Sequence, residues 1–240
     1  MEVVAFIIII LIASVLQTST GFGFSIMATP FLLLLFEPAE AIQINLILSL
    51  VISSALIMKI KRDIDLGILK RFVTGSVIGL AIGIAVFLHM DMNRLKMGVA
   101  LMIIALTIML ILKFRMNQSK ERDLLIGGIS GSLTTSIGVP GPPILLYFSG
   151  TDTPKEIVRG TTLAFYLFIY FVSLIIQVVF AGTSKTTWVS SLWALPLVFL
   201  GLYLGGKLFK WIDPKVFRLF TYIILLFTGI YLLSESVGSL

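Results

Sequence analysis

Long hydrophobic runs alternate with short polar segments along the chain. Six of these runs are uninterrupted, and each is close to the length of about 20 residues that a helix needs to cross a hydrocarbon core of about 30 Å. They lie at 41–58, 71–88, 95–112, 157–180, 188–207 and 215–234. Because these runs are apolar throughout rather than at every second residue, they predict transmembrane helices and disfavour a β-barrel.

Two further hydrophobic stretches, 3–36 and 123–149, are interrupted by small polar residues and helix breakers. The first contains Q-T-S-T-G-F-G-F-S at residues 17–25, and the second contains G-S-L-T-T-S-I-G-V-P-G-P-P at residues 131–143. Glycine and proline at this density cannot continue a regular helix. Lipid cannot satisfy a broken backbone, so both breaks must face protein or a water-filled cavity.

The basic residues indicate the side of the membrane on which each loop lies. Of the 18 Lys and Arg residues, 15 lie in the segments 59–71, 113–122, 150–160 and 207–218. The other three lie in the loops between them, at 36–41, 88–96 and 181–187. Because Lys and Arg concentrate in cytoplasmic loops, the four basic segments are predicted to be cytoplasmic and the three other loops external.

This orientation requires the interrupted stretch 123–149 to start and finish on the cytoplasmic side. Its 27 residues reach only about 40 Å as helix, which is too short for two full crossings. It is therefore predicted to be a re-entrant hairpin that turns near the middle of the membrane. Stretch 3–36 is the expected counterpart from the outside, although its length also allows two short spans.

The two halves of the chain resemble each other, with opposite loop charge. The shared features are the glycine series Gly75-x3-Gly79-x3-Gly83 and Gly201-x3-Gly205, each followed eight residues later by an aspartate, Asp91 and Asp213. Chance similarity of two hydrophobic halves is the alternative. The pattern predicts an all-α polytopic membrane protein with two inverted-topology repeats, 1–112 and 123–240, joined by a basic cytoplasmic linker, 113–122. Each repeat is expected to be a broken, re-entrant hairpin followed by three transmembrane helices, an architecture of secondary transporters.

Composition supports a membrane protein and removes several classes of function. Hydrophobic residues make up 58% of the chain and charged residues 12%, which is half the share of about 25% in soluble globular proteins. The chain has no Cys and one His, His89, so thiolate, disulfide and metal chemistry are not expected. An enzyme in the membrane needs a nucleophile with a base or a metal, so we expect no catalytic residue, no metal, no cofactor and no enzyme activity. The net charge of +6 is explained by membrane topology, and nucleic acid is not an expected partner.

The interrupted helices favour binding of a small anion. A half-helix that starts at a break presents free N–H groups and the positive end of its dipole. Hydroxyl groups add donors, and glycine lets a ligand approach the backbone closely. The alternative is that small residues only let helices pack closely. We prefer that alternative for the repeated glycines Gly75, Gly79, Gly83, Gly201 and Gly205, and prefer binding for the two breaks.

The break sequences resemble a known family. T-G-F-G-F-S-x3-T-P-F-L-L-L from Thr20 and G-S-x-T-T-S-I-G-x-P-G-P-P from Gly131 are similar to the two glycine-rich signatures of the sulfite exporter TauE/SafE family. The chain length, the basic central loop and the late G-I-Y-L-L run are similar as well, so the resemblance covers nearly the whole chain.

The resemblance implies a secondary-type transporter in the inner (cell) membrane of a prokaryote. It would import or export sulfur-containing oxyanions, such as sulfite or organosulfonates, so its expected partners are such an anion and the lipid bilayer; a homo-oligomer stays open. Matching motifs carry substrate-binding roles over to Thr20, Gly21, Gly23, Ser25, Thr135, Ser136, Gly138 and Gly141. An anion channel of the same architecture, or a transporter of another small anion, is the alternative.

Three polar residues near the breaks leave two interpretations open. Asn45 and Thr161 follow the first and second break, and each either lines the pathway as a binding residue or joins neighbouring helices. Arg159 either docks an anion or extends its charge towards the membrane surface. No ionisable residue lies near the middle of a hydrophobic stretch, so coupling to protons through a buried acid is not expected.

Overall fold

The computed structural model describes residues 2–21, 23–112, 118–151, 153–208 and 214–238. These residues form ten α-helices and one short 3-10 helix, and they contain no strand, which confirms the all-α prediction. The helices are α1 (Glu2–Thr20), α2 (Phe24–Leu35), α3 (Pro38–Ile60), α4 (Leu66–His89), α5 (Met92–Ile111), α6 (Lys120–Ile137), α7 (Gly141–Ser149), α8 (Lys155–Ala181), α9 (Lys185–Leu208) and α10 (Pro214–Gly238), with the 3-10 helix at Lys61–Asp63.

Five helices are long and apolar enough to cross a membrane, namely α1, α3, α4, α8 and α9. The predicted spans 95–112 and 215–234 correspond to α5 and α10, which contribute the shorter apolar segments Lys96–Ile111 and Leu225–Ser236. The predicted spans thus all fall on helices of the structure.

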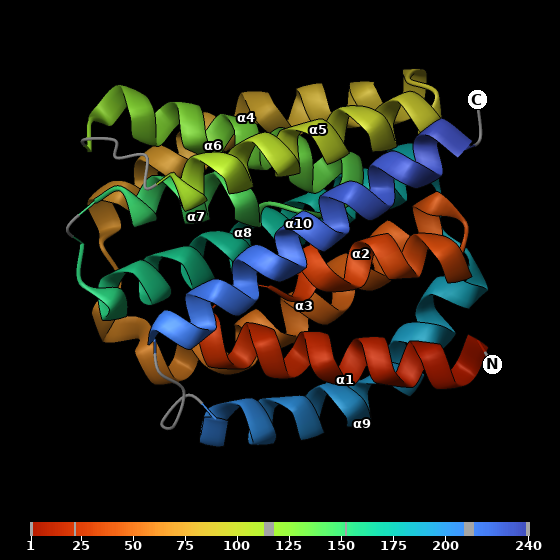
Figure 1. Cartoon of the computed structure of the whole chain (residues 1–240), viewed down its shortest axis with the longest axis horizontal. Helices are drawn as coiled ribbons and strands as arrows, with labels where there is room; N and C mark the ends of the chain where they lie inside the picture. The colour runs from red at the N-terminus through yellow and green to blue at the C-terminus, as the bar shows by residue number, and fades with distance from the viewer. Residues whose placement is uncertain (1, 22, 113–117, 152, 209–213, 239–240) are drawn as a thin grey trace.

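Both interrupted stretches fold as a long helix followed by a short one. The first consists of α1, with 19 residues, and α2, with 12; the second consists of α6, with 18 residues, and α7, with 9. At 1.5 Å per residue, the short helices span only part of a bilayer. Figure 1 shows the free ends of α1 and α2 at the right of the view and those of α6 and α7 at the left, so the two hairpins enter the bundle from opposite ends.

The long arm of each hairpin packs on a helix that carries the repeated glycines. On α4, a Cβ built at Gly75 or Gly79 would overlap the backbone carbonyl of Leu124 or Gly128 on α6. On α9, a Cβ built at Gly205 would lie 2.6 Å from the carbonyl oxygen of Val15 on α1. Small residues allow this approach of two backbones, so the predicted packing role of these glycines is confirmed.

The short helices α2 and α7 lie in the interior, and the packing around them is reciprocal. In the first half α2 packs on α10 and α1 packs on α9; in the second half α7 packs on α5 and α6 packs on α4. In addition, α3 packs on α8 and α5 packs on α10, so each of these helices contacts its counterpart in the other half. α7 is buried from Gly141 to Ile144 and again from Leu146 to Phe148. The two short helices therefore sit where the helices of both halves converge.

Candidate functional site

The first break separates α1 from α2 with two glycines in unusual backbone conformations. Gly21 has φ of 86° and Gly23 has φ of 129°, values that strongly favour glycine. Gln17 bridges the break, because its backbone carbonyl accepts from Gly21 N at 2.8 Å and its side-chain Oε1 accepts from Phe24 N at 3.0 Å. The first amide of α2 therefore already has a partner from the protein.

The second break separates α6 from α7 with one left-handed glycine and three prolines. Gly138 has φ of 77°, and its N–H donates to the carbonyl of Thr134 at 2.8 Å. α7 begins at Gly141 and continues with Pro142 and Pro143, which carry no N–H. The prediction that a half-helix at this break presents several free N–H groups is therefore wrong for α7. This helix keeps its dipole, but its first turn offers only the backbone amide of Gly141.

Side chains from α3 and α8 satisfy the carbonyl groups that the breaks expose. Asn45 Nδ2 donates to the carbonyl of Gly138 at 2.8 Å, and Gln177 Nε2 donates to that of Thr135 at 2.5 Å. Arg159 Nη2 donates to the carbonyl of Thr18, at the end of α1, at 2.7 Å. Arg159 thus holds the first break instead of extending towards the membrane surface, and the donor of Asn45 is engaged at the second break.

A Thr-Ser-x-Gly sequence ends the long helix at both breaks, at residues 18–21 and 135–138. In both copies the hydroxyl groups donate to the carbonyl four residues earlier, as Thr18 does to Ser14 at 2.7 Å and Ser136 does to Ser132 at 2.8 Å. Thr135 Oγ1 lies 3.3 Å from the carbonyl of Gly131 and 3.1 Å from Ser173 Oγ. The hydroxyls of Thr135 and Ser136 must therefore rotate away from their own helix before they can donate to an anion.

Two tyrosines on α8, one turn apart, reach the first turns of the two short helices. Tyr170 Oη lies 3.2 Å from Ser25 Oγ, in the first turn of α2. Tyr166 Oη would lie 3.2 Å from a Cβ built on Gly141, the first residue of α7. Both tyrosines are fully buried, and their ring centroids are 5.2 Å apart. Both tyrosines fall inside a hydrophobic run, so the sequence pattern did not mark them as site residues, although a buried hydroxyl in a transmembrane helix calls for a polar partner.

The first turns of α2 and α7 meet directly. A Cβ on Gly141 would lie 2.9 Å from Ile26 Cδ1, so only a glycine allows this contact without a shift of Ile26. Of the predicted site residues, Ser25 and Gly141 lie in the two first turns, and Asn45 bonds to Gly138 at the second break. The others that lie in or directly beside a break are Gly21, Gly23, Thr135 and Ser136.

The predicted site residues Thr161 and Thr20 are not observed at the contact between α2 and α7. Thr161 Oγ1 accepts from Asp65 N at 2.9 Å, close to the start of α4, so it joins helix ends away from the breaks. Thr20 ends α1, and its side chain lies outside the described part of the structure.

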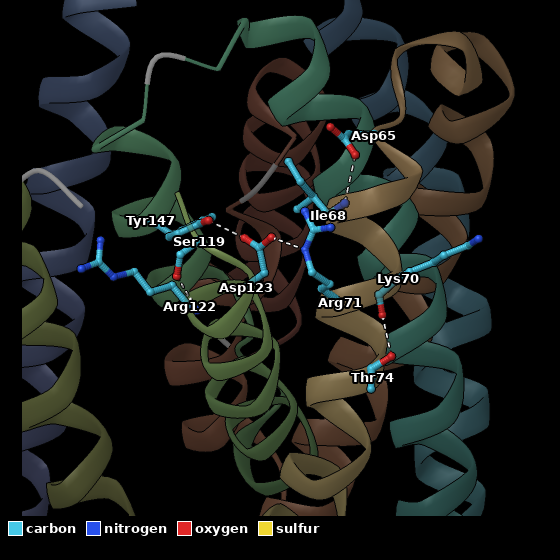
Figure 2. A network of polar contacts seen from close by, with 9 residues as sticks. All are labelled: Asp65, Ile68, Lys70, Arg71, Thr74, Ser119, Arg122, Asp123 and Tyr147. Atoms are coloured by element: carbon cyan, nitrogen blue, oxygen red, sulfur yellow. Dashed lines mark hydrogen bonds and ion pairs between the residues drawn. The ribbon is translucent and has the colours of Figure 1, made fainter. Parts of the chain in front are cut away.

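A buried carboxylate lies at the open end of the second hairpin. Asp123, on α6, is fully buried and accepts from Arg71 Nε of α4 at 2.5 Å and from the hydroxyl of Tyr147 on α7 (Figure 2). The three residues connect both arms of the hairpin to α4. The sequence placed Asp123 at the edge of a hydrophobic stretch but gave no sign of its partners.

A narrow cavity lies beside the second break, between α2, α5 and α10. Its wall includes Val139 from the break and the side chains of Thr29, Lys96 and Thr228. Lys96 is ion-paired with Glu235 at 2.5 Å, which joins α5 to α10. Among the residues that the structure describes, no group of three or more His, Asp or Glu side chains could hold a metal ion.

The comparisons with known proteins identify the family. The family model of the sulfite exporter TauE/SafE matches residues 6–232, which include both breaks. No curated protein and no solved structure gives a significant match. Because the family model covers nearly the whole chain, this protein belongs to the sulfite exporter TauE/SafE family.

Proposed function

We propose that the protein is a secondary-type transporter that carries a sulfur-containing oxyanion, such as sulfite or an organosulfonate, between its two interrupted helices. The observation that carries the proposal is the meeting of the first turns of α2 and α7 at Ile26 and Gly141 inside the bundle. Two helix N-termini that face one point offer positive dipole ends to an anion. Family membership supports sulfur oxyanions as the class of substrate.

The polar groups at the breaks suit weak, reversible binding. Arg159 donates to the carbonyl of Thr18 at the first break, and Lys96 beside the second break is ion-paired with Glu235, so both cations already have protein partners. A site built from dipoles and hydroxyl groups can attract an anion without the strong pairing that a buried Lys or Arg would impose. We therefore assign substrate contacts to Gly21, Gly23, Ser25, Thr135, Ser136, Gly138 and Gly141, with Asn45 as a support of the second break.

We further propose that residues 1–112 and 123–240 are inverted repeats that rock against each other around this site. The reciprocal packing of α1 on α9 and α6 on α4 supports this arrangement, as does the entry of the hairpins from opposite ends (Figure 1). With the basic segments on the cytoplasmic side, the α6–α7 hairpin opens to the cytoplasm of a prokaryotic cell and the α1–α2 hairpin opens to the outside.

Membrane potential alone can drive export. An anion that leaves a negative-inside cell gains about 2.3 kcal/mol per charge per 100 mV. Asp123 is buried but already paired with Arg71, so it gives no free acid for coupling to protons. Concentrative flux driven by a pH gradient at zero voltage, for a substrate form whose charge is constant, would contradict this mechanism.

The proposal is tested by sulfite flux into proteoliposomes at fixed voltage, with sulfate, thiosulfate and taurine as competitors. Saturable, voltage-driven flux is expected, with counterflow that separates a carrier from a channel. Gly23→Leu and Gly138→Leu are expected to abolish it, because both positions have positive φ. Gly206→Leu is the matched control, since a Cβ at Gly206 meets nothing within 4 Å. Flux that is absent from the wild-type protein, with no competitor protecting it against heat, would refute the proposal.

A further inference from the structure

The N-terminus of α7 has few hydrogen-bond donors of its own. Pro142 and Pro143 occupy positions whose N–H groups would otherwise point at a ligand, and Pro140 precedes them. At the N-terminus of α2, the amide of Phe24 already donates to Gln17. An anion withdrawn from water needs donors to replace its hydration, and the first turn of α7 offers only the backbone amide of Gly141.

Tyr166 supplies a donor where α7 lacks them. Its side chain is fully buried, and its hydroxyl has no hydrogen-bond partner among the described residues. The hydroxyl points at the first residue of α7, since a Cβ on Gly141 would lie 3.2 Å from Tyr166 Oη. Burying an unpaired hydroxyl is unfavourable, so a purely structural role would be filled better by phenylalanine.

Tyr170 takes the same place at α2. It lies one helical turn after Tyr166 on α8, and its hydroxyl is 3.2 Å from Ser25 Oγ. Either hydroxyl of this pair can donate to the other, and Ser49 on α3 also interacts with the Tyr170 hydroxyl. Tyr170 therefore donates to a ligand by exchanging one of these protein partners. α8 therefore directs one phenol to each of the two positive helix ends.

We propose that Tyr166 and Tyr170 are the principal hydrogen-bond donors to the transported anion, one at each short helix. This inference rests on the proposed function and names the residues that recognise its substrate. Two neutral O–H donors at two positive helix ends fit a small oxyanion whose oxygen atoms only accept. The close spacing of the rings favours a compact head group over a bulky one.

The test uses Tyr166→Phe and Tyr170→Phe in the full-length protein, with Tyr203→Phe as control. Tyr203 lies on α9, its side chain is 60% exposed, and its ring contacts Lys207. Phenylalanine keeps the ring packing and removes only the hydroxyl. We measure the KM for sulfite in proteoliposomes and the rise in Tm that sulfite gives the purified protein. A hydrogen bond to a charged group corresponds to about tenfold or more in affinity.

In each of the two variants the KM for sulfite should rise about tenfold or more, and sulfite should raise the Tm by less than it does in the wild type. In Tyr203→Phe both the KM and the sulfite-induced rise in Tm should equal those of the wild type. The Tm of Tyr166→Phe without sulfite should equal or exceed that of the wild type, which a structural role of the hydroxyl would not allow. Wild-type KM in both variants would overturn this inference alone, as would a fall of ligand-free Tm with KM unchanged. Absence of both flux and stabilisation in the wild-type protein would overturn the proposed function, and this inference with it.

Discussion

Gly138 shows how a single residue shapes the second break. It ends α6 with φ of 77°, and a Cβ at this position would lie 2.6 Å from Asn45 Nδ2, the group that donates to the carbonyl of Gly138 itself. Glycine is therefore needed twice, once for the backbone conformation and once for the approach of Asn45.

Replacing this glycine by alanine tests both requirements. Gly138→Ala should destabilise the protein by about 1–2 kcal/mol from the left-handed conformation alone, and more if Asn45 is displaced. Unfolding in detergent measures the change. Gly98→Ala is the control, because a Cβ on Gly98 meets nothing within 4 Å. Equal stability of Gly138→Ala and the wild-type protein would show that neither requirement holds.

For single residues, the sequence predicted the location of the site well but predicted the role of each side chain poorly. The clusters of glycine, proline and small polar residues located both breaks. However, the prolines that marked the second break also removed the donors expected there. Tyr170 meets Ser25 across 145 residues, and Thr161 bonds to Asp65 across 96 residues. Such contacts depend on tertiary packing, which a single sequence does not reveal.

The pairing of α4 with α6 is decided by a row of small residues on one helix face. Gly79→Leu should prevent this pairing and abolish recovery of monodisperse protein, since even a Cβ at Gly79 would overlap the carbonyl of Gly128. Ala81→Leu, at an exposed position of the same helix, should leave recovery unchanged. Size-exclusion chromatography in detergent distinguishes the two outcomes, and a normal profile for Gly79→Leu would contradict the observed packing.

The ion pair between Arg71 and Asp123 fixes the second hairpin to α4 (Figure 2). Asp123 is fully buried whereas Arg71 is partly exposed, so removing Arg71 leaves a buried carboxylate without its cation. Arg71→Ala should therefore lower the free energy of unfolding by about 3 kcal/mol. Glu121→Ala, at an exposed acid two residues before Asp123 on α6, should cost less than about 1 kcal/mol.

A double-mutant cycle isolates the contribution of this pair. Arg71→Ala and Asp123→Ala should be non-additive, because each single change removes the same interaction. Additive losses in unfolding experiments would show that the two side chains act independently.

The helices themselves were largely predictable, because length and hydrophobicity decide whether a segment can cross a bilayer. The length of 123–149 also excluded two full crossings, and α6 and α7 form one long and one short arm. What the sequence could not predict is the partner of each arm. The glycines on α4 and α9 indicated close packing, but not that α6 and α1 are the helices packed there.

For the whole molecule, the absence of cysteine allows the predicted orientation to be tested with single introduced thiols. Arg94→Cys and Lys185→Cys should react with a membrane-impermeant maleimide in intact cells, because their loops are predicted to be external. Arg62→Cys and Glu121→Cys should react only after permeabilisation. The reverse pattern would contradict the orientation, and with it the assignment of the second hairpin to the cytoplasmic side.

The central claim is that the anion lies between the first turns of α2 and α7. The most direct measurement is the anomalous difference density of crystals grown with selenite, which has the shape and charge of sulfite. A selenium peak is expected beside Gly141, within hydrogen-bond reach of Tyr166 and Tyr170. A peak elsewhere, such as at Arg159 or Lys96, with none between the two short helices, would contradict it.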